Sequence, residues 1–117
     1  MLYLKYFLTS VTTFLMAVHS FHYQDTKTKI RVINSTEFEI YNISLFSIGF
    51  ENLEPGHMSC FKDIHYNYLK DDPLIYATIN NINLGLYLEI PVEDKKNTYT
   101  IDSVDLNTKR LYVGLKN

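Results

Sequence analysis

One short segment of the chain carries the residue types that bind metal ions or act as nucleophiles. His57, Cys60, Asp63 and His65 lie within nine residues of one another. On an extended strand, successive side chains point to opposite faces, so His57, Asp63 and His65 share a face that Cys60 does not. The four side chains therefore cannot surround one tetrahedral ion. A metal-binding or enzymatic module using His57, Asp63 and His65 is one hypothesis. Under the alternative hypothesis these residues have only a structural role: the histidines lie at the rim of a strand, and Cys60 is a small residue of the hydrophobic core.

Other catalytic interpretations are weaker. A catalytic cysteine would need a histidine to meet Cys60 across the sheet, and no motif supplies an oxyanion hole. The acidic pairs Asp71-Asp72 and Glu93-Asp94 fit solvent-exposed loops better than calcium ligands. No stretch carries a cofactor-binding signature, so we expect a non-enzymatic protein without a cofactor or metal.

Tyrosine is the other residue type with a possible recognition role. The chain has 10 Tyr, and four of them are candidates for a binding surface. A tyrosine side chain offers a rigid apolar ring with a polar tip, which suits recognition of a partner. The alternative is that these residues only cover a sheet. The candidate binding residues are Tyr66, Tyr68, Tyr76 and Tyr87.

Length and composition limit what the chain can be. With 117 residues, 46% of them apolar, it forms one small domain at most. Eleven Lys and Arg against 13 Asp and Glu give a formal charge of -2, which argues against nucleic acid as a partner. The single Cys60 cannot form an internal disulfide, so core packing must stabilise the fold.

The first 20 residues have the layout of a secretory signal peptide. Lys5 is their only charged residue, and the apolar run 6–18 follows it. This run has 13 residues, whereas about 20 are needed to cross a membrane. An uncleaved anchor and a buried element of the fold are the alternatives. We expect cleavage between Ser20 and Phe21, export to the periplasm or the medium, and no membrane span in the remaining domain, residues 21–117.

The rest of the chain has the pattern of β-strands. From Lys29 onward, apolar residues recur mostly at a spacing of two, between clusters of Asn, Asp, Pro and Gly. Seven short strands without helices predict an all-β fold, a two-sheet antiparallel β-sandwich of the immunoglobulin-like kind. The expected strands are 29–33, 38–47, 58–64, 74–79, 84–90, 98–104 and 110–115, with a possible short eighth near 48–51.

Turn residues support this division. In Glu54-Pro55-Gly56-His57, Pro fixes φ at the second position and Gly permits a positive φ at the third, as a type II turn requires. The segments 80–83 and 105–109 are expected to close hairpins. Residues 71–73 and 93–97 are expected to form exposed loops.

Strand alternation also predicts a core, with one inconsistency. Ile40 and Ile43 have opposite parity, as do Phe61 and Ile64, so a regular strand cannot bury both members of a pair. Either a bulge or a strand covered on both faces would bury both. The expected inward residues are Ile30, Val32, Ile40, Ile43, Leu45, Phe61, Ile64, Ile75, Ala77, Ile79, Leu86, Leu88, Tyr99, Ile101, Leu111 and Val113.

Several of these features occur together in one known group. Asn34-Ser35-Thr36 precedes a strand with Ile40 and Ile43, Leu53-Glu54-Pro55-Gly56 follows with Ser59 and Phe61, and later come Tyr66, Tyr68 and Thr98-Tyr99-Thr100. Over residues 29–117, this order resembles small exported immunoglobulin-like β-sandwich proteins of Bacteroidetes-type bacteria, which are often lipoproteins. The resemblance implies the fold and export, and it supplies no active site. The lipidated amino-terminal Cys of that group is absent here.

Three functions follow as hypotheses. The preferred one is a secreted or periplasmic, non-enzymatic β-sandwich that binds a protein or a glycan at the cell envelope, through a sheet face or loop ends. The second is the metal-dependent or enzymatic module on His57, Asp63 and His65. The third is a structural or inhibitory partner that adds an edge strand to another sheet.

Overall fold

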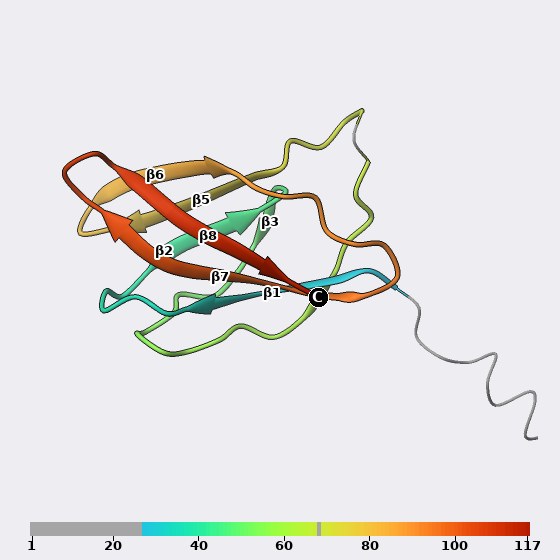
Figure 1. The fold of residues 1–117 in the computed structure, drawn as a ribbon, viewed down its shortest axis with the longest axis horizontal. Coiled ribbons are helices and arrows are strands. Elements are labelled where there is room, and N and C mark those ends of the chain that lie inside the picture. Colours follow the sequence, from blue (N-terminus) through green and yellow to red (C-terminus); the bar gives the residue numbers. More distant parts are fainter. Residues whose placement is uncertain (1–26, 68) are drawn as a thin grey trace, which may run out of the picture.

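The computed structural model describes residues 27–67 and 69–117, which form eight strands and no helix (Figure 1). The predicted leader, residues 1–20, and Tyr68 lie outside the described residues. The all-β prediction is confirmed. The strands are β1 (Lys29–Asn34), β2 (Tyr41–Leu45), β3 (Ile48–Gly49), β4 (Lys62–Asp63), β5 (Leu74–Ile79), β6 (Ile82–Tyr87), β7 (Lys96–Asp105) and β8 (Arg110–Lys116).

The strands form two four-stranded sheets, in the orders β4-β1-β7-β8 and β3-β2-β5-β6. Their inner faces enclose one hydrophobic core, so the predicted β-sandwich is confirmed. Every pair of neighbouring strands is antiparallel except β1 and β7, which run parallel. The parallel pair places the start of β1 and the end of β8 at the same end of the sheet (Figure 1).

The core follows the predicted alternation closely. In β1, β5 and the first half of β7, every second residue is buried. Each buried Leu, Ile or Phe side chain stabilises the fold by about 1.5–3 kcal/mol. Thirteen of the predicted inward residues are buried, whereas Phe61, Leu86 and Val113 are only partly buried. The core also contains four residues that the strand pattern did not predict, namely Phe46, Phe50, Leu53 and Leu84.

A β-bulge in β2 resolves the parity conflict between Ile40 and Ile43. The register of β2 against β5 shifts between Tyr41 and Ser44, and Asn42 has a φ of 50°. The extra residue turns Ile43 back toward the core, so both isoleucines are buried. Of the two alternatives that the sequence left open, the bulge is therefore correct here.

The predicted strand over 58–64 is wrong over most of its length. Only β4 is regular, and a single bridge joins Met58 to Ile33. The hydroxyl of Ser59 accepts a hydrogen bond of 2.9 Å from the Val32 amide, which replaces a ladder bond with a side-chain bond. Because the backbone is irregular here, side chains in this segment do not alternate strictly between the core and the solvent. Ile64 is buried, but Cys60 is exposed and is not the core residue that we expected.

The predicted strand over 38–47 is also too long. Phe46 and Ser47 have φ values of 52° and 66° and form the turn between β2 and β3. A positive φ is rare for a bulky residue, so no sequence signal marked this turn. The Phe46 side chain is buried, and its ring lies 5.4 Å from the Tyr66 ring and 5.9 Å from the Tyr99 ring. Burial of the ring offsets the backbone strain.

Two predicted turns are confirmed. Gly56 has a φ of 78°, and the His57 amide donates a hydrogen bond of 3.0 Å to the Glu54 carbonyl. Asn80 and Asn81, with φ values of 50° and 61°, alone connect β5 to β6, so β6 begins at Ile82 rather than at Leu84. Two successive positive φ values match the twist of a hairpin.

Asn97 corrects the prediction that residues 93–97 are all exposed. It is fully buried, and its Oδ1 accepts a hydrogen bond of 2.8 Å from the Val92 amide. Its Nδ2 donates to the Val92, Lys95 and Lys29 carbonyls at 3.0, 3.0 and 3.3 Å. This amide therefore ties the loop before β7 to the start of β1.

Candidate functional site

The residues of the predicted metal segment do not converge. His57 lies 3.8 Å from the Glu54 carboxylate, whereas Asp63 lies 3.7 Å from the Lys27 ammonium and 3.6 Å from that of Lys29. His65 lines a separate cavity. Across residues 27–67 and 69–117, no three His, Cys, Asp or Glu side chains come close enough together to hold a metal ion. The geometry therefore gives no support to a site on His57, Asp63 and His65.

The four predicted binding tyrosines do not form one surface. Tyr68 lies outside the described residues. Tyr66 is partly buried, and its ring packs edge-on against Phe46. Tyr76 and Tyr87 are 55% and 73% exposed, and both point outward from the sheet that contains β5 and β6. Of the four predicted tyrosines, only Tyr76 and Tyr87 therefore lie on one exposed face that could bind a partner.

Close packing across two strands positions the Tyr76 ring. Tyr76 in β5 pairs with Gly85 in β6. A Cβ atom at Gly85 would lie 3.2 and 3.3 Å from two carbons of the Tyr76 ring, so one side of the ring packs closely against the glycine. Tyr87 is two residues beyond Gly85 on the same face, so it is a diagonal neighbour of Tyr76 at about 7–8 Å. Both side chains are exposed on this outer face.

Tyr41 extends this surface onto a third strand. It pairs with Thr78 across β2 and β5, and its side chain is 39% exposed. A hydrogen bond to the Glu39 carboxylate, with smaller contributions from burial and the charges of Glu39 and Glu54, raises the pKa of Tyr41. We call the outer surface of β2, β5 and β6 that carries Tyr41, Tyr76 and Tyr87 the tyrosine face.

Within β5 and β6 the tyrosine face carries no charged side chain, and the Glu39 carboxylate lies at its β2 side, beside Tyr41. Its other outward positions in β5 and β6 are Leu74, Thr78, Asn83 and Gly85. The Thr78 hydroxyl donates a hydrogen bond of 2.8 Å to the side-chain oxygen Oδ1 of Asn83. Exposed tyrosine rings with hydroxyl and amide groups beside them can contact an uncharged ligand that has both apolar and hydroxyl surface.

Gly85 is a sequence signal for part of this face that strand alternation alone does not reveal. A glycine inside a strand indicates that another group approaches the backbone closely, and Gly85 has this role. Tyr41 could not be placed on the same face from the sequence, because the bulge at Asn42 changes the parity of β2.

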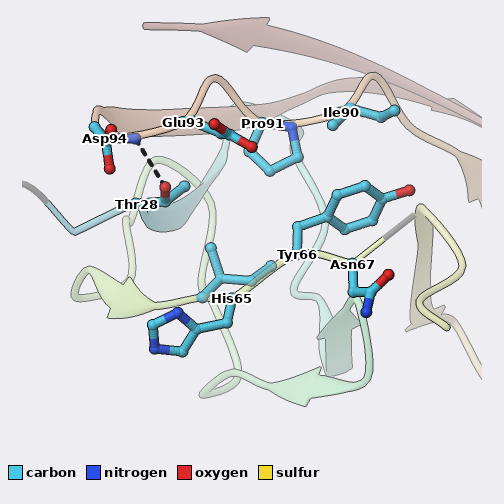
Figure 2. A pocket seen from close by; sticks show the side chains of 9 residues that line it. Thr28, His65, Tyr66, Asn67, Ile90, Pro91, Glu93 and Asp94 are labelled. Carbon is cyan, nitrogen blue, oxygen red and sulfur yellow. Dashed lines mark hydrogen bonds between the residues drawn. The ribbon is translucent and has the colours of Figure 1, made fainter. Parts of the chain in front are cut away.

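Tyr66 belongs instead to a cavity of about 560 Å³ between the segment 64–67 and the loop 90–94 (Figure 2). Ile64 and Pro91 provide apolar walls. The polar groups do not converge in it. The Thr28 hydroxyl accepts a hydrogen bond of 2.8 Å from the Asp94 amide, and Figure 2 shows the His65 ring pointing away from the loop 90–94. The cavity therefore presents no arranged set of polar groups to a ligand.

The sheet edges are poorly suited to pairing with another chain. At one side of the sandwich, the edge strands β3 and β4 have two residues each, and the Lys62 ammonium donates a hydrogen bond to the Gly49 carbonyl. At the other side, the edge strands β6 and β8 contact each other. Short edges, charged side chains and covered edges all discourage strand addition.

Neither a scan against models of known protein families nor a search of curated proteins finds a match to this chain. In the described part of the chain, no helix has the length and apolar character to cross a membrane. The function is therefore argued from the geometry of the surfaces.

Proposed function

We propose that this protein is an exported, non-enzymatic binding module of the cell envelope that holds a neutral glycan on the tyrosine face. The observation that carries the proposal is the exposed Tyr76 ring packed closely against Gly85, with the exposed Tyr87 in the diagonal position on the same face. Two neighbouring aromatic rings on a rigid sheet form a platform that loses little conformational entropy when a ligand binds.

The chemistry of a sugar ring matches this platform. One side of a pyranose carries C–H groups, which are apolar and slightly positive, and an aromatic face is negative. The hydroxyl groups at the edge of the sugar need hydrogen-bond partners, and Thr78 and Asn83 lie next to the rings on the same face. The outward positions of β5 and β6 around the two rings are uncharged, so an uncharged ligand can bind there without desolvating a charged group.

Affinity gel electrophoresis tests the binding. The full chain would be run through gels that contain a β-glucan, an α-glucan, a xylan or a mannan, beside the variants Tyr76→Ala and Tyr87→Ala. Tyr112→Ala is the matched control, because Tyr112 is also an exposed strand tyrosine but belongs to β8 in the other sheet. We expect at least one polysaccharide to retard the chain, with binding about tenfold weaker in Tyr76→Ala and Tyr87→Ala.

Two results would overturn the glycan proposal. One is no retardation by any of the four polysaccharides. The other is equal retardation of Tyr76→Ala, Tyr87→Ala and the parent chain. If a protein partner captured by the parent chain is lost with Tyr87→Ala while no polysaccharide binds, the tyrosine face is a protein interface instead. Export is tested separately by determining the amino-terminal residue of the protein recovered from its host, which we expect to be Phe21.

A further inference from the structure

The outer surface of the other sheet is basic rather than neutral. Lys29 in β1 lies beside Lys96 in the parallel strand β7. In the next row, Thr98 lies between Arg31 in β1 and Lys116 in β8. All of these positions alternate with core residues, so they lie on the outer face of the sheet.

Two more lysines join this group at its edge. Lys27 and Lys95, together with Lys29, Lys96 and Asp94, line a hollow of about 280 Å³. Six of the 11 Lys and Arg side chains of the chain thus gather at one end of one sheet. We call this surface the basic face, and its members are Lys27, Lys29, Arg31, Lys95, Lys96 and Lys116.

Few acidic groups offset these charges. Asp63 lies within 3.7 Å of Lys27 and 3.6 Å of Lys29, and Asp94 lines the hollow. The Asp102 carboxylate lies over Gly114, two residues before Lys116. Among the described residues, positive groups therefore outnumber negative ones on this face, although the whole chain has a formal charge of -2. Like charges side by side on neighbouring strands destabilise a sheet. An anionic partner above the face would relieve this repulsion.

An aromatic ring holds two of the cations in place. The Arg31 guanidinium lies 4.5 Å from the centre of the Phe61 ring, and the Lys96 ammonium lies 5.4 Å from it. The Arg31 guanidinium also lies 3.4 Å from the sulfur of Met58, whose side chain is exposed. The surface thus combines fixed positive charge with an exposed apolar side chain, which suits the boundary between lipid headgroups and acyl chains.

We propose that the basic face binds the anionic phospholipid headgroups of a membrane surface. Each lysine or arginine side chain near such a surface adds a similar favourable free energy of binding. Salt screens this attraction, so it acts only over about one Debye length. The basic and tyrosine faces belong to the outer sides of different sheets. The module can therefore lie on a membrane and present the tyrosine face away from it. This inference does not depend on the glycan proposal.

Vesicle cosedimentation tests the inference. The full chain would be mixed with vesicles of phosphatidylcholine alone, or of equimolar phosphatidylcholine and phosphatidylglycerol, beside the variants Lys96→Gln and Lys116→Gln. Lys109→Gln is the matched control, because it removes the same charge from the loop between β7 and β8, at the opposite end of the sheet. All variants share one amino terminus, so any membrane affinity of the apolar run is common to them. Circular dichroism verifies that each variant is folded.

We expect binding to the anionic vesicles to weaken about fivefold for each lysine removed from the basic face, and to be unchanged in Lys109→Gln. Lys96→Arg, which keeps the charge, should bind like the parent chain, and added salt should reduce binding of the parent. Equal binding by Lys96→Gln, Lys116→Gln and Lys109→Gln would overturn the inference. Lysine-dependent binding to soluble dextran sulfate but not to the anionic vesicles would also overturn it. Tyr76→Ala should not alter vesicle binding, so this result and the glycan result can fail separately.

Discussion

The side-chain amide of Asn34 donates a hydrogen bond of 3.0 Å to the carbonyl of Leu53, 19 residues further along the chain. The same nitrogen donates to the Phe38 carbonyl at 2.7 Å, and the side-chain oxygen accepts from the Thr36 amide and hydroxyl. Asn34 is fully buried at the end of β1. One side chain therefore joins the end of a strand, the turn after it and the segment before the Pro55-Gly56 turn.

Replacing Asn34 should lower the free energy of unfolding strongly. Asn34→Ala removes the partners of two carbonyl groups, and we expect a loss of about 2–4 kcal/mol. Asn34→Asp should lose more, because a carboxylate would face the two carbonyls without a donor. Urea denaturation measures both. Asn107→Ala, in the exposed β7–β8 loop, is the control and should change stability by less than about 0.5 kcal/mol. Equal losses in Asn34→Ala and Asn107→Ala would contradict this role for Asn34.

A substitution in the turn at Phe46 and Ser47 should stabilise the protein. Ser47 has a φ of 66°, which glycine adopts without strain, so Ser47→Gly should raise the free energy of unfolding by about 0.5–1 kcal/mol. The matched control is Ser103→Gly in β7, where φ is not positive, and this change should lower stability by about 0.5–1 kcal/mol. Thermal unfolding measures whether each variant is more or less stable than the parent chain. A loss of stability in both would show that Ser47 is not strained.

Tyr99 should make the fold sensitive to alkali. Burial, with a smaller contribution from the charge of Glu89, raises the pKa of Tyr99 above its ordinary value, and its hydroxyl donates a hydrogen bond of 2.7 Å to the Glu89 carbonyl. The unfolded chain loses this proton near pH 10 while the folded chain keeps it, so stability falls as the pH rises above about 10.

Tyr99→Phe should separate this effect from other alkaline titrations. At pH 7 the variant should lose about 1 kcal/mol with the hydrogen bond. Above pH 10 its stability should fall less steeply than that of the parent chain. Urea denaturation at a series of pH values measures the slopes, and Tyr112→Phe, at an exposed position, serves as the control. Parallel slopes for parent and Tyr99→Phe would count against Tyr99 as a source of alkaline sensitivity.

Gly85→Ala should disturb the tyrosine face without unfolding the protein. The new Cβ would lie 3.2 Å from the Tyr76 ring, so the exposed ring must shift, whereas the backbone φ of Gly85 suits any residue. We expect an unchanged or slightly higher melting temperature, because alanine loses less backbone entropy than glycine. Retardation by the polysaccharide that binds the parent chain should weaken. Gly114→Ala, on the opposite sheet, should leave retardation unchanged, and a matching loss there would argue against a specific role for the Tyr76 ring.

Cys60 should react with thiol reagents in the folded protein. Its side chain is exposed, because the segment before β4 is not a regular strand. A water-soluble disulfide reagent should therefore label the native chain at nearly the rate seen in urea, and Cys60→Ser should change stability by less than about 0.5 kcal/mol. Strong protection of the native thiol would contradict the exposed position.

Local signals in the sequence predicted the elements that depend on them. The alternation of Ile30, Val32, Ile75, Ala77 and Ile79 requires only that two sheets share a core, and all five residues are buried as expected. Pro55-Gly56 determines its turn, because proline fixes φ and glycine permits a positive φ in any surroundings. Alternation predicted that His57, Asp63 and His65 share a face, but even a straight strand holds residues 57 and 63 about 20 Å apart. The structure gives no support to a metal site on them, because the three side chains have separate surroundings.

The sequence by itself determined that the chain forms strands, most of the residues that fill the core, and where proline, glycine and asparagine turn the backbone, because these preferences act over a few residues. Only the tertiary structure decided the strained turn at Phe46, the bulge at Asn42 and the separation of Tyr66 from Tyr76. It also brought Lys29, Lys96 and Lys116 together. Contacts between distant segments set these features, since burial of a ring or pairing with a particular strand outweighs the local preference of the backbone.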